Sequence, residues 1–268
     1  MSIRISLSGR LFEESYQKNT LTMREFAETA AGIGYQGVEL RTTQVTFETP
    51  DHTVREYRQI LKDYGLEVVS LEARGYPVLD DEDLFRRFLD LAAQFDCALM
   101  RTGGDPFKTA RCAETAATRH IRIGLNNHIG TEEKPGWTET IERTVTYLRL
   151  VNHPNFCILY DACHLFMSGS DYGPDAIRKI AGSIFSVLVQ SLVETDSENG
   201  TIRFHGRYFR NGDVGEKGGP DLKRVIDGLR LINYDGYVGV IAPMPENGKP
   251  LDTAERYHRY IRNLLEST

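Results

Sequence analysis

Segments typical of β-strands alternate with segments typical of helices along the whole chain. The first pair is a strand at 4–10 and a helix at 20–34, where apolar residues recur at helical spacing and Gly34 suits the C-terminal cap. Such alternation implies a parallel sheet covered by helices. Seven more strand and helix pairs follow, at 37–42 and 54–65, 67–75 and 81–95, 98–104 and 108–120, 121–127 and 138–151, 156–166 and 173–182, 184–195 and 219–232, and 236–242 and 253–265.

Eight such units favour closure into a barrel over an open, doubly wound sheet. The length of 268 residues fits one barrel of this kind, and no linker or shift in composition divides the chain. The sequence therefore predicts an α/β protein with a single (β/α)8 TIM barrel over residues 1–268.

One segment after the seventh predicted strand does not fit the simple repeat. Residues 196–213 place the Asn199-Gly200 pair between two alternating runs, which is typical of a β-hairpin. We expect this hairpin insertion to lie over the carboxyl-terminal mouth of the barrel, as a lid or as an interface.

Charge and hydropathy exclude several classes of protein. The formal net charge of -6 disfavours binding to a nucleic-acid backbone, although local basic residues remain available for a small anionic ligand. The sequence has no apolar run long enough to cross a membrane and no secretory signal, so we expect a cytoplasmic location and no membrane partner. The sequence leaves open whether the chain forms a homo-oligomer or a hetero-oligomer.

The four cysteines lack the spacing of a metal site or a disulfide framework, which favours reduced thiols. Cys163 lies between Asp161 and His164 in the sequence. It can be read as a nucleophile or as a small buried apolar residue, and the second interpretation is favoured.

Polar residues gather where the predicted strands end. In a barrel of this kind, catalytic groups come from the carboxyl ends of the strands and the loops after them. The candidates on this basis are Glu39, Arg41, Glu72, Arg74, Arg101, Asn126, Asn127, His128, Asp161, His164, Gln190 and Glu194.

Three of these candidates, His128, Asp161 and His164, are predicted to be catalytic. Asp161 and His164 follow one apolar strand, where they can bind a metal or form a proton-transfer couple. Alternatively, Asp161 caps the next helix and His164 packs beside it. His128 is either an imidazole of the site or only the polar end of its strand.

The other polar candidates are expected to bind substrate or to hold the barrel wall. Glu72 follows a buried run, so its charge needs a partner such as Arg74 or Arg101. Glu39 is read as structural, accepting hydrogen bonds from backbone inside the barrel. The predicted substrate-binding residues are Glu72, Arg101, Asn126, Asn127, Gln190 and Arg207.

Four motifs give the chain a family resemblance: "GYQGVEL" at 34–40, "NNH" at 126–128, "LYDACHL" at 159–165 and "YDGYVGVI" at 234–241. With them the chain resembles the xylose isomerase-like TIM-barrel superfamily of sugar isomerases and epimerases, which also includes the AP endonuclease 2 type. The resemblance covers nearly the whole chain.

The resemblance implies a divalent metal held by a Glu, an Asp, a His and a Glu at the ends of the fifth to eighth strands. Only Asp161 matches this set. Asn126 stands at the first Glu position, no histidine occurs at 183–203, and the last Glu position falls on Ile241 or Ala242. We therefore expect the usual Mg²⁺ or Mn²⁺ site to be lost, together with the family's pair of acid-base glutamates, and we predict no cofactor.

The first hypothesis is an enzyme acting on a keto sugar or sugar derivative. His128, Asp161 and His164 would transfer protons in an isomerisation, an epimerisation or a β-elimination. The amides of Asn126, Asn127 and Gln190 would hold the oxygens of the sugar.

Two alternatives stay open. In one, a rebuilt metal site uses His128, Asp161, His164 and His205 of the hairpin, ligands that zinc accepts. In the other, the chain is a noncatalytic sugar-binding or partner subunit that has kept the barrel and lost the chemistry.

Overall fold

Eight parallel strands close into a barrel in the computed structural model, which describes residues 3–131, 133–246 and 248–267. The predicted (β/α)8 barrel is therefore confirmed. Around the barrel the order is β1 (Arg4–Ser8), β13 (Tyr237–Val240), β9 (Ile184–Val189), β8 (Phe156–Asp161), β7 (Arg122–Asn126), β6 (Leu99–Arg101), β5 (Glu67–Glu72) and β4 (Gly37–Leu40), which pairs with β1 again.

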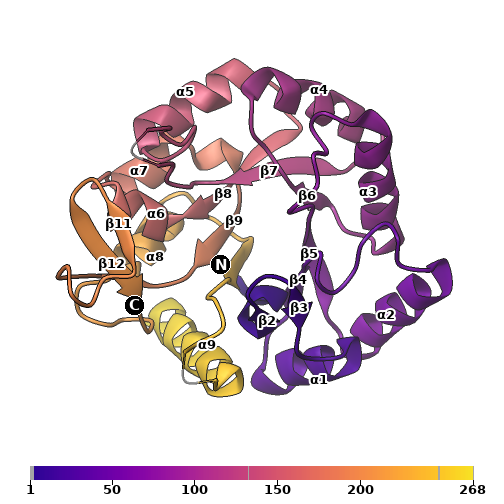
Figure 1. Ribbon diagram of the computed structural model, residues 1–268, viewed down its shortest axis with the longest axis horizontal. Coiled ribbons are helices and arrows are strands. Elements are labelled where there is room, and N and C mark those ends of the chain that lie inside the picture. Colours follow the sequence, from indigo (N-terminus) through magenta and orange to yellow (C-terminus); the bar gives the residue numbers. More distant parts are fainter. Residues whose placement is uncertain (1–2, 132, 247, 268) are drawn as a thin grey trace.

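Helices form an outer ring around the strands (Figure 1). The first of them starts at residue 23 rather than at the predicted residue 20, and its N-cap Thr22 forms a capping box with Glu25. It ends at the predicted C-cap, Gly34, which has a left-handed φ of 108°. The ring contains α1 (Met23–Ile33), α2 (Asp51–Asp63), α3 (Glu82–Gln94), α4 (Pro106–Ala117), α5 (Ile141–Val151), α7 (Pro174–Lys179), α8 (Leu222–Leu231) and α9 (Pro250–Glu266).

An apolar layer fills the barrel below its polar mouth. Because side chains alternate between the two faces of a strand, Cys157 and Leu159 of β8 point to the same side as Asp161. They pack with Leu99 and Ile241. Gly124 of β7 leaves room for this layer, because a Cβ at that position would lie 2.4 Å from Cδ1 of Leu159. The layer closes the floor beneath the polar residues at the strand ends.

The insertion predicted after the seventh barrel strand is confirmed as a small antiparallel sheet. Its strands are β10 (Leu192–Thr195), β11 (Ile202–Phe204) and β12 (Arg207–Asn211), with β12 in the middle. The tight turn is at His205 and Gly206, which have φ of 47° and 74°, rather than at Asn199-Gly200. Asn199 instead donates to Asp196 within the loop between β10 and β11.

All eight predicted barrel strands are shorter in the structure, and polar residues that cap the next helical turn end two of them. Ser8 ends β1, its hydroxyl accepts from the amide of Arg10, and a 3₁₀ turn, η1 (Gly9–Phe12), follows. Asp161 ends β8 and caps α6 (Ala162–Met167), so the predicted strand at 156–166 is half helix. The strand predicted at 184–195 is β9 followed by β10.

A second hairpin, β2 (Glu13–Glu14) and β3 (Lys18–Asn19), follows η1.

In the part of the chain that the structure describes, no helix has the length and apolar character that a membrane crossing requires.

Gly124→Ala should destabilise the chain, because the added methyl forces Leu159 out of the packed layer inside the barrel. We expect a loss of about 1–3 kcal/mol in the free energy of unfolding, measured by urea denaturation. Gly182→Ala is the matched control, since nothing lies within 4 Å of a Cβ there. Equal stability of the two variants would contradict the tight packing.

Candidate active site at the carboxyl end of the barrel

A pocket with a volume of about 510 Å³ opens at the carboxyl ends of the barrel strands. Its size lies within the range of small-molecule sites, about 300–1,000 Å³. The small antiparallel sheet supplies one wall through Leu192, Ile202 and Asn211. Six of the predicted site residues line the pocket together: Glu72, Arg101, Asn126, His128, His164 and Gln190.

A larger cavity, about 700 Å³, lies at the opposite end of the barrel. Its polar groups pair with one another: Arg4 donates to Glu67 at 2.8 Å, and the Tyr237 hydroxyl donates to the same carboxylate at 2.8 Å. In barrels of this kind the amino ends of the strands contribute to stability, whereas the carboxyl ends carry the chemistry. The smaller pocket is therefore the candidate active site.

Gln190, directly after β9, links three polar groups of this site. Arg10 donates to Gln190 Oε1 at 3.0 Å, so the amide nitrogen faces the other way and donates to Asp161 Oδ2 at 2.8 Å. That nitrogen also lies 3.2 Å from Nε2 of His164. Because an amide nitrogen only donates, Nε2 of His164 must accept, and its proton sits on Nδ1, which is buried without a partner among the described residues.

His128 has the same tautomer as His164, but its Nε2 lone pair is not engaged by a neighbouring donor. Its Nδ1 lies 2.5 Å from the carbonyl oxygen of Ile129, which can only accept, so Nδ1 carries the proton and Nε2 does not. The ring stacks on that of His164, with 4.0 Å between centroids and 34° between planes. The two imidazoles lie against each other in the pocket wall.

Both imidazoles are held in the neutral form. Burial lowers the pKa of His164 well below 6.5, and the neighbouring His128 lowers it further. His128 is reached by solvent through the pocket, but protein surrounds much of its ring; this partial burial, with the positive charges of Arg101, Arg10 and Arg74, lowers its pKa below 6.5. At neutral pH each ring can therefore accept a proton but carries no charge.

The loop after β7 holds His128 by close backbone contacts. The Thr138 hydroxyl accepts from the amide of His128, and the Glu139 carboxylate accepts from the amides of Gly130 and Gly136. A Cβ on Gly136 would lie 2.4 Å from the carbonyl oxygen of His128, so only glycine permits this approach.

Asp161 lies beneath the pocket rather than in its wall. It is fully buried, and burial raises its pKa to about 6. Its Oδ1 caps α6 by accepting from the amide of Cys163, and Oδ2 accepts from Gln190. The capping alternative is therefore present in the structure, together with a contact to the candidate site.

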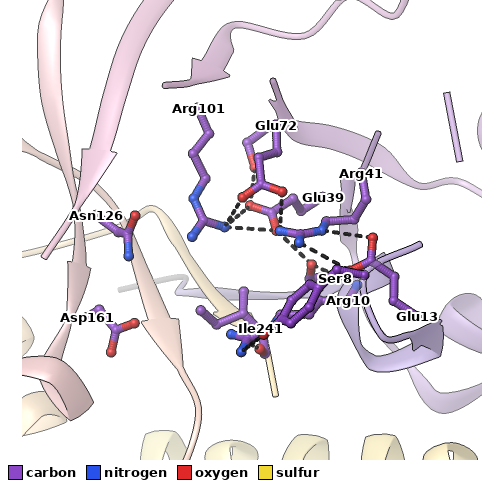
Figure 2. A network of polar contacts seen from close by, with 12 residues as sticks. Ser8, Arg10, Glu13, Glu39, Arg41, Glu72, Arg101, Asn126, Asp161 and Ile241 are labelled. Carbon is purple, nitrogen blue, oxygen red and sulfur yellow. Dashed lines mark hydrogen bonds and ion pairs between the residues drawn. The ribbon is translucent and has the colours of Figure 1, made fainter. Parts of the chain in front are cut away.

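A buried network of charges lies beside the histidines (Figure 2). Arg41 Nη2 lies 3.2 Å from Glu13 Oε2, and Arg41 Nη1 contacts Glu72. Arg101 Nη1 lies 3.1 Å from Glu39 and 3.6 Å from Glu72. We call Glu13, Glu39, Arg41, Glu72 and Arg101 the mouth network.

Glu39 is buried within the mouth network. It accepts hydrogen bonds from the hydroxyls of Ser8 and Ser70 and from Arg101, where we expected backbone donors. Burial raises its pKa, but the charges of Arg101 and Arg41 and the two hydroxyls outweigh that effect, and the pKa falls below 4.5. Glu39 is thus ionised and structural.

Four further candidates from the sequence, Asn127, Glu194, His205 and Arg207, lie outside the pocket wall. Asn127 is buried: it donates to Thr144 Oγ1 at 2.7 Å and accepts from the amide of Asp161. Arg207 pairs with Glu194 on the small sheet. His205, at the hairpin turn, is not among the residues that line the pocket.

Sequence reasoning missed Arg10 and Tyr16 and left Arg41 and Arg74 out of the chosen set, although all four line the pocket. Arg10 and Tyr16 follow the first barrel strand. Applying the strand-end rule from the first strand rather than the second would have included Arg10.

The residues present do not fit the divalent metal that the family resemblance implies. The side-chain amide of Gln190 directs its N–H group at Asp161, and this positively polarised group repels a cation. At Ile241, where the family resemblance places a carboxylate ligand, Arg10 donates to the backbone carbonyl at 3.0 Å. Over residues 3–131, 133–246 and 248–267, no group of three or more His, Cys, Asp or Glu side chains could hold a metal ion. A rebuilt site through His205 has no support in this geometry.

The four cysteines are free and buried, in agreement with the expectation of reduced thiols. The sulfur of Cys163 accepts from the amide of Leu192, and burial raises the pKa of its thiol well above the ordinary value. A protonated, buried thiol is a poor nucleophile.

Glu39→Gln should destabilise the chain by about 3–5 kcal/mol at pH 7, because it leaves Arg41 and Arg101 short of one carboxylate in a buried network. The lowered pKa of Glu39 adds stability that is present above pH 4.5 and lost as the pH falls through that pKa. The stability difference from wild type should therefore shrink in acid, as measured by urea denaturation against pH.

The exposed Glu48→Gln is the control for this test and should change stability little at any pH. A difference between wild type and Glu39→Gln that stays constant down to pH 3 would contradict the assigned role of the ionised carboxylate.

Comparison with known proteins agrees with this architecture. The family model described as Xylose isomerase-like TIM barrel matches residues 27–264. No curated protein matches the sequence significantly. Among solved structures, the probable 3-DHS dehydratase AsbF from Bacillus anthracis is 17% identical with a TM-score of 0.74, over 97% of this chain and 99% of that chain.

Two sugar epimerases share the same fold. D-psicose 3-epimerase is 15% identical with a TM-score of 0.74, over 99% of this chain and 100% of its own. L-ribulose 3-epimerase is 15% identical with a TM-score of 0.73, over 98% of this chain and 95% of its own. At such low identity these likenesses establish the fold alone, but the family match spans most of the sequence. The chain belongs to the xylose isomerase-like TIM barrel family.

Proposed function

We propose that this protein is an enzyme that removes a proton next to the carbonyl group of a keto sugar or sugar derivative, with His128 as the base. His128 then gives that proton to the neighbouring carbon in an isomerisation, or to the departing hydroxyl, which leaves as water, in a β-elimination. The solved structures of the same fold include 3-epimerases and a probable dehydratase. Epimerisation, isomerisation and β-elimination of a keto sugar all begin by moving such a proton.

The free Nε2 lone pair of His128 carries this proposal. The Ile129 carbonyl fixes the tautomer, and the lowered pKa keeps the ring unprotonated at neutral pH. A base that is already neutral and lines a pocket can take a proton from a bound substrate without first losing one.

Arg101 is suited to stabilise the charge that this step creates. When the C–H bond breaks, its electron pair moves toward the carbonyl oxygen, which becomes an enolate. Arg101 contacts Glu39 and Glu72 through Nη1 only, and Figure 2 shows its other terminal nitrogen directed away from both acids. That nitrogen is available to donate to the enolate oxygen.

Asn126 supplies an acceptor in the same wall. Its Nδ2 donates to the carbonyl oxygen of Asn127 at 3.1 Å, which leaves Oδ1 to accept from a sugar hydroxyl. We assign substrate binding to Asn126 and Arg101, and a positioning role to Gln190.

One free imidazole favours a reaction with a single base. Nε2 of His164 is engaged by Gln190, so His164 positions the ring of His128 rather than sharing its role. Isomerisation and elimination need one base to carry the proton, whereas epimerisation by two bases needs one on each face of the carbon. We therefore favour isomerisation or elimination over two-base epimerisation.

His128→Gln should lower kcat by about a hundredfold or more, because the amide cannot accept the substrate proton. The assay incubates the full chain with keto sugars, sugar acids and sugar phosphates in D2O and follows deuterium incorporation and new products by NMR. In wild type, kcat/KM should fall on the acid side with a pKa below 6.5, as His128 becomes protonated.

The control is the exposed His52→Gln on α2, which should keep full activity. Wild-type turnover that survives in His128→Gln would contradict the role of His128. A sugar that raises the melting temperature without any deuterium incorporation would instead favour the noncatalytic sugar-binding alternative.

A further inference from the structure

Positive charge in the pocket wall exceeds negative charge. Of the described residues that line it, four are arginines, Arg10, Arg41, Arg74 and Arg101, and one, Glu72, is an acid. Arg41 and Arg101 are neutralised within the mouth network. The excess charge therefore resides on Arg10 and Arg74.

Arg10 is held by neutral acceptors alone. It donates to Gln190 Oε1 and to the Ile241 carbonyl at 3.0 Å each, and to the Tyr16 hydroxyl at 2.7 Å. No carboxylate of residues 3–131, 133–246 or 248–267 forms an ion pair with it, and its Nε is buried without a partner there. A partly buried guanidinium without an anion is costly, and a ligand anion would relieve that cost.

Arg74 meets Arg10 at the ring of Tyr16. The Arg74 guanidinium lies 3.8 Å from the ring centroid and that of Arg10 lies 5.4 Å from it. Arg74 is exposed, and within the described part of the chain no acid pairs with it either. Two unneutralised guanidinium groups thus share one aromatic ring at the edge of the pocket.

The turn that carries Tyr16 is held in an unfavourable conformation. Ser15 and Tyr16, between β2 and β3, have φ of 49° and 58°, a left-handed region that non-glycine residues rarely adopt. Burial raises the pKa of Tyr16, but the two neighbouring arginines outweigh this effect and lower it below 10. The ring therefore lies in a strongly positive environment.

We propose that Arg10 and Arg74, held on the ring of Tyr16, bind an oxyanion of the substrate, so that the pocket takes a sugar phosphate or a sugar acid in preference to a neutral sugar. Guanidinium groups match the planar or trigonal faces of carboxylate and phosphate with paired N–H donors. This proposal rests on the proposed function in taking the ligand to be the sugar substrate of the same pocket.

The test measures binding separately from turnover. Titration calorimetry of the full chain compares D-fructose 6-phosphate, 5-keto-D-gluconate and neutral D-fructose. At least one anion should bind about tenfold more tightly than D-fructose and should weaken with added NaCl. The tighter of the two anions identifies phosphate or carboxylate as the preferred group.

Arg74→Gln should lower the affinity for that anion about tenfold and leave the affinity for D-fructose unchanged. Since Arg74 is exposed, this variant should fold even if Arg10→Gln, which also frees Gln190, does not. Arg149→Gln, an exposed arginine on α5 outside the pocket, is the matched control and should change nothing.

Equal affinity for all three sugars, no binding of either anion, or unchanged anion affinity in Arg74→Gln would each overturn the anion site. Arginine-dependent anion binding with neither deuterium incorporation nor a new product would support the anion site and contradict the proposed function. Turnover of D-fructose with no preference for the anions would contradict the anion site and support the proposed function.

Discussion

The mouth network is the constraint on which the rest of the site depends. Its five charged side chains, Glu13, Glu39, Arg41, Glu72 and Arg101, are taken out of water where β4, β5 and β6 end. Charges can be buried only when paired and hydrogen-bonded, so each member fixes the position of its neighbours. Arg101 in particular has one terminal nitrogen tied to the acids and one left for the pocket (Figure 2). The network thus sets the wall against which the proposed substrate binds.

On the other side of the pocket, arginine and amide groups stand where the family resemblance implies a metal. Arg10 orients Gln190, and Gln190 in turn donates to Asp161 and contacts His164. The positive charge near Asp161 comes from Arg101 and Arg10, which lower its pKa against the larger effect of burial.

The barrel could be predicted from the sequence because the same strand and helix pattern repeats along the whole chain. Each strand and helix pair carries its own periodicity, and eight pairs leave little choice of architecture. The rule that active groups follow strand ends also located Glu72, His128 and Gln190 correctly in one pocket. Where it failed, the reason was local: Asn126 and Asn127 are adjacent, but only Asn126 faces the pocket, since the next residue points the other way.

Other features depend on contacts that periodicity does not encode. Asp161 ends β8 by capping α6, although the apolar run continues beyond it. Arg10 reaches the pocket because β1 ends early at Ser8 and a 3₁₀ turn redirects the chain. Tyr16 reaches the pocket through a turn with left-handed φ angles, and no glycine in the sequence marks that turn. Each is a tertiary or capping effect, visible only once the strands are in place.

The central claim is that Arg10 and Gln190 leave no site at Asp161 for the divalent cation that the family resemblance implies. Calorimetric titration of the metal-free chain with Mn²⁺ tests it most directly, because the claim concerns the donor set around Asp161 and not any particular substrate. The account predicts no saturable binding of Mn²⁺. Stoichiometric binding that disappears in Asp161→Ala would contradict it.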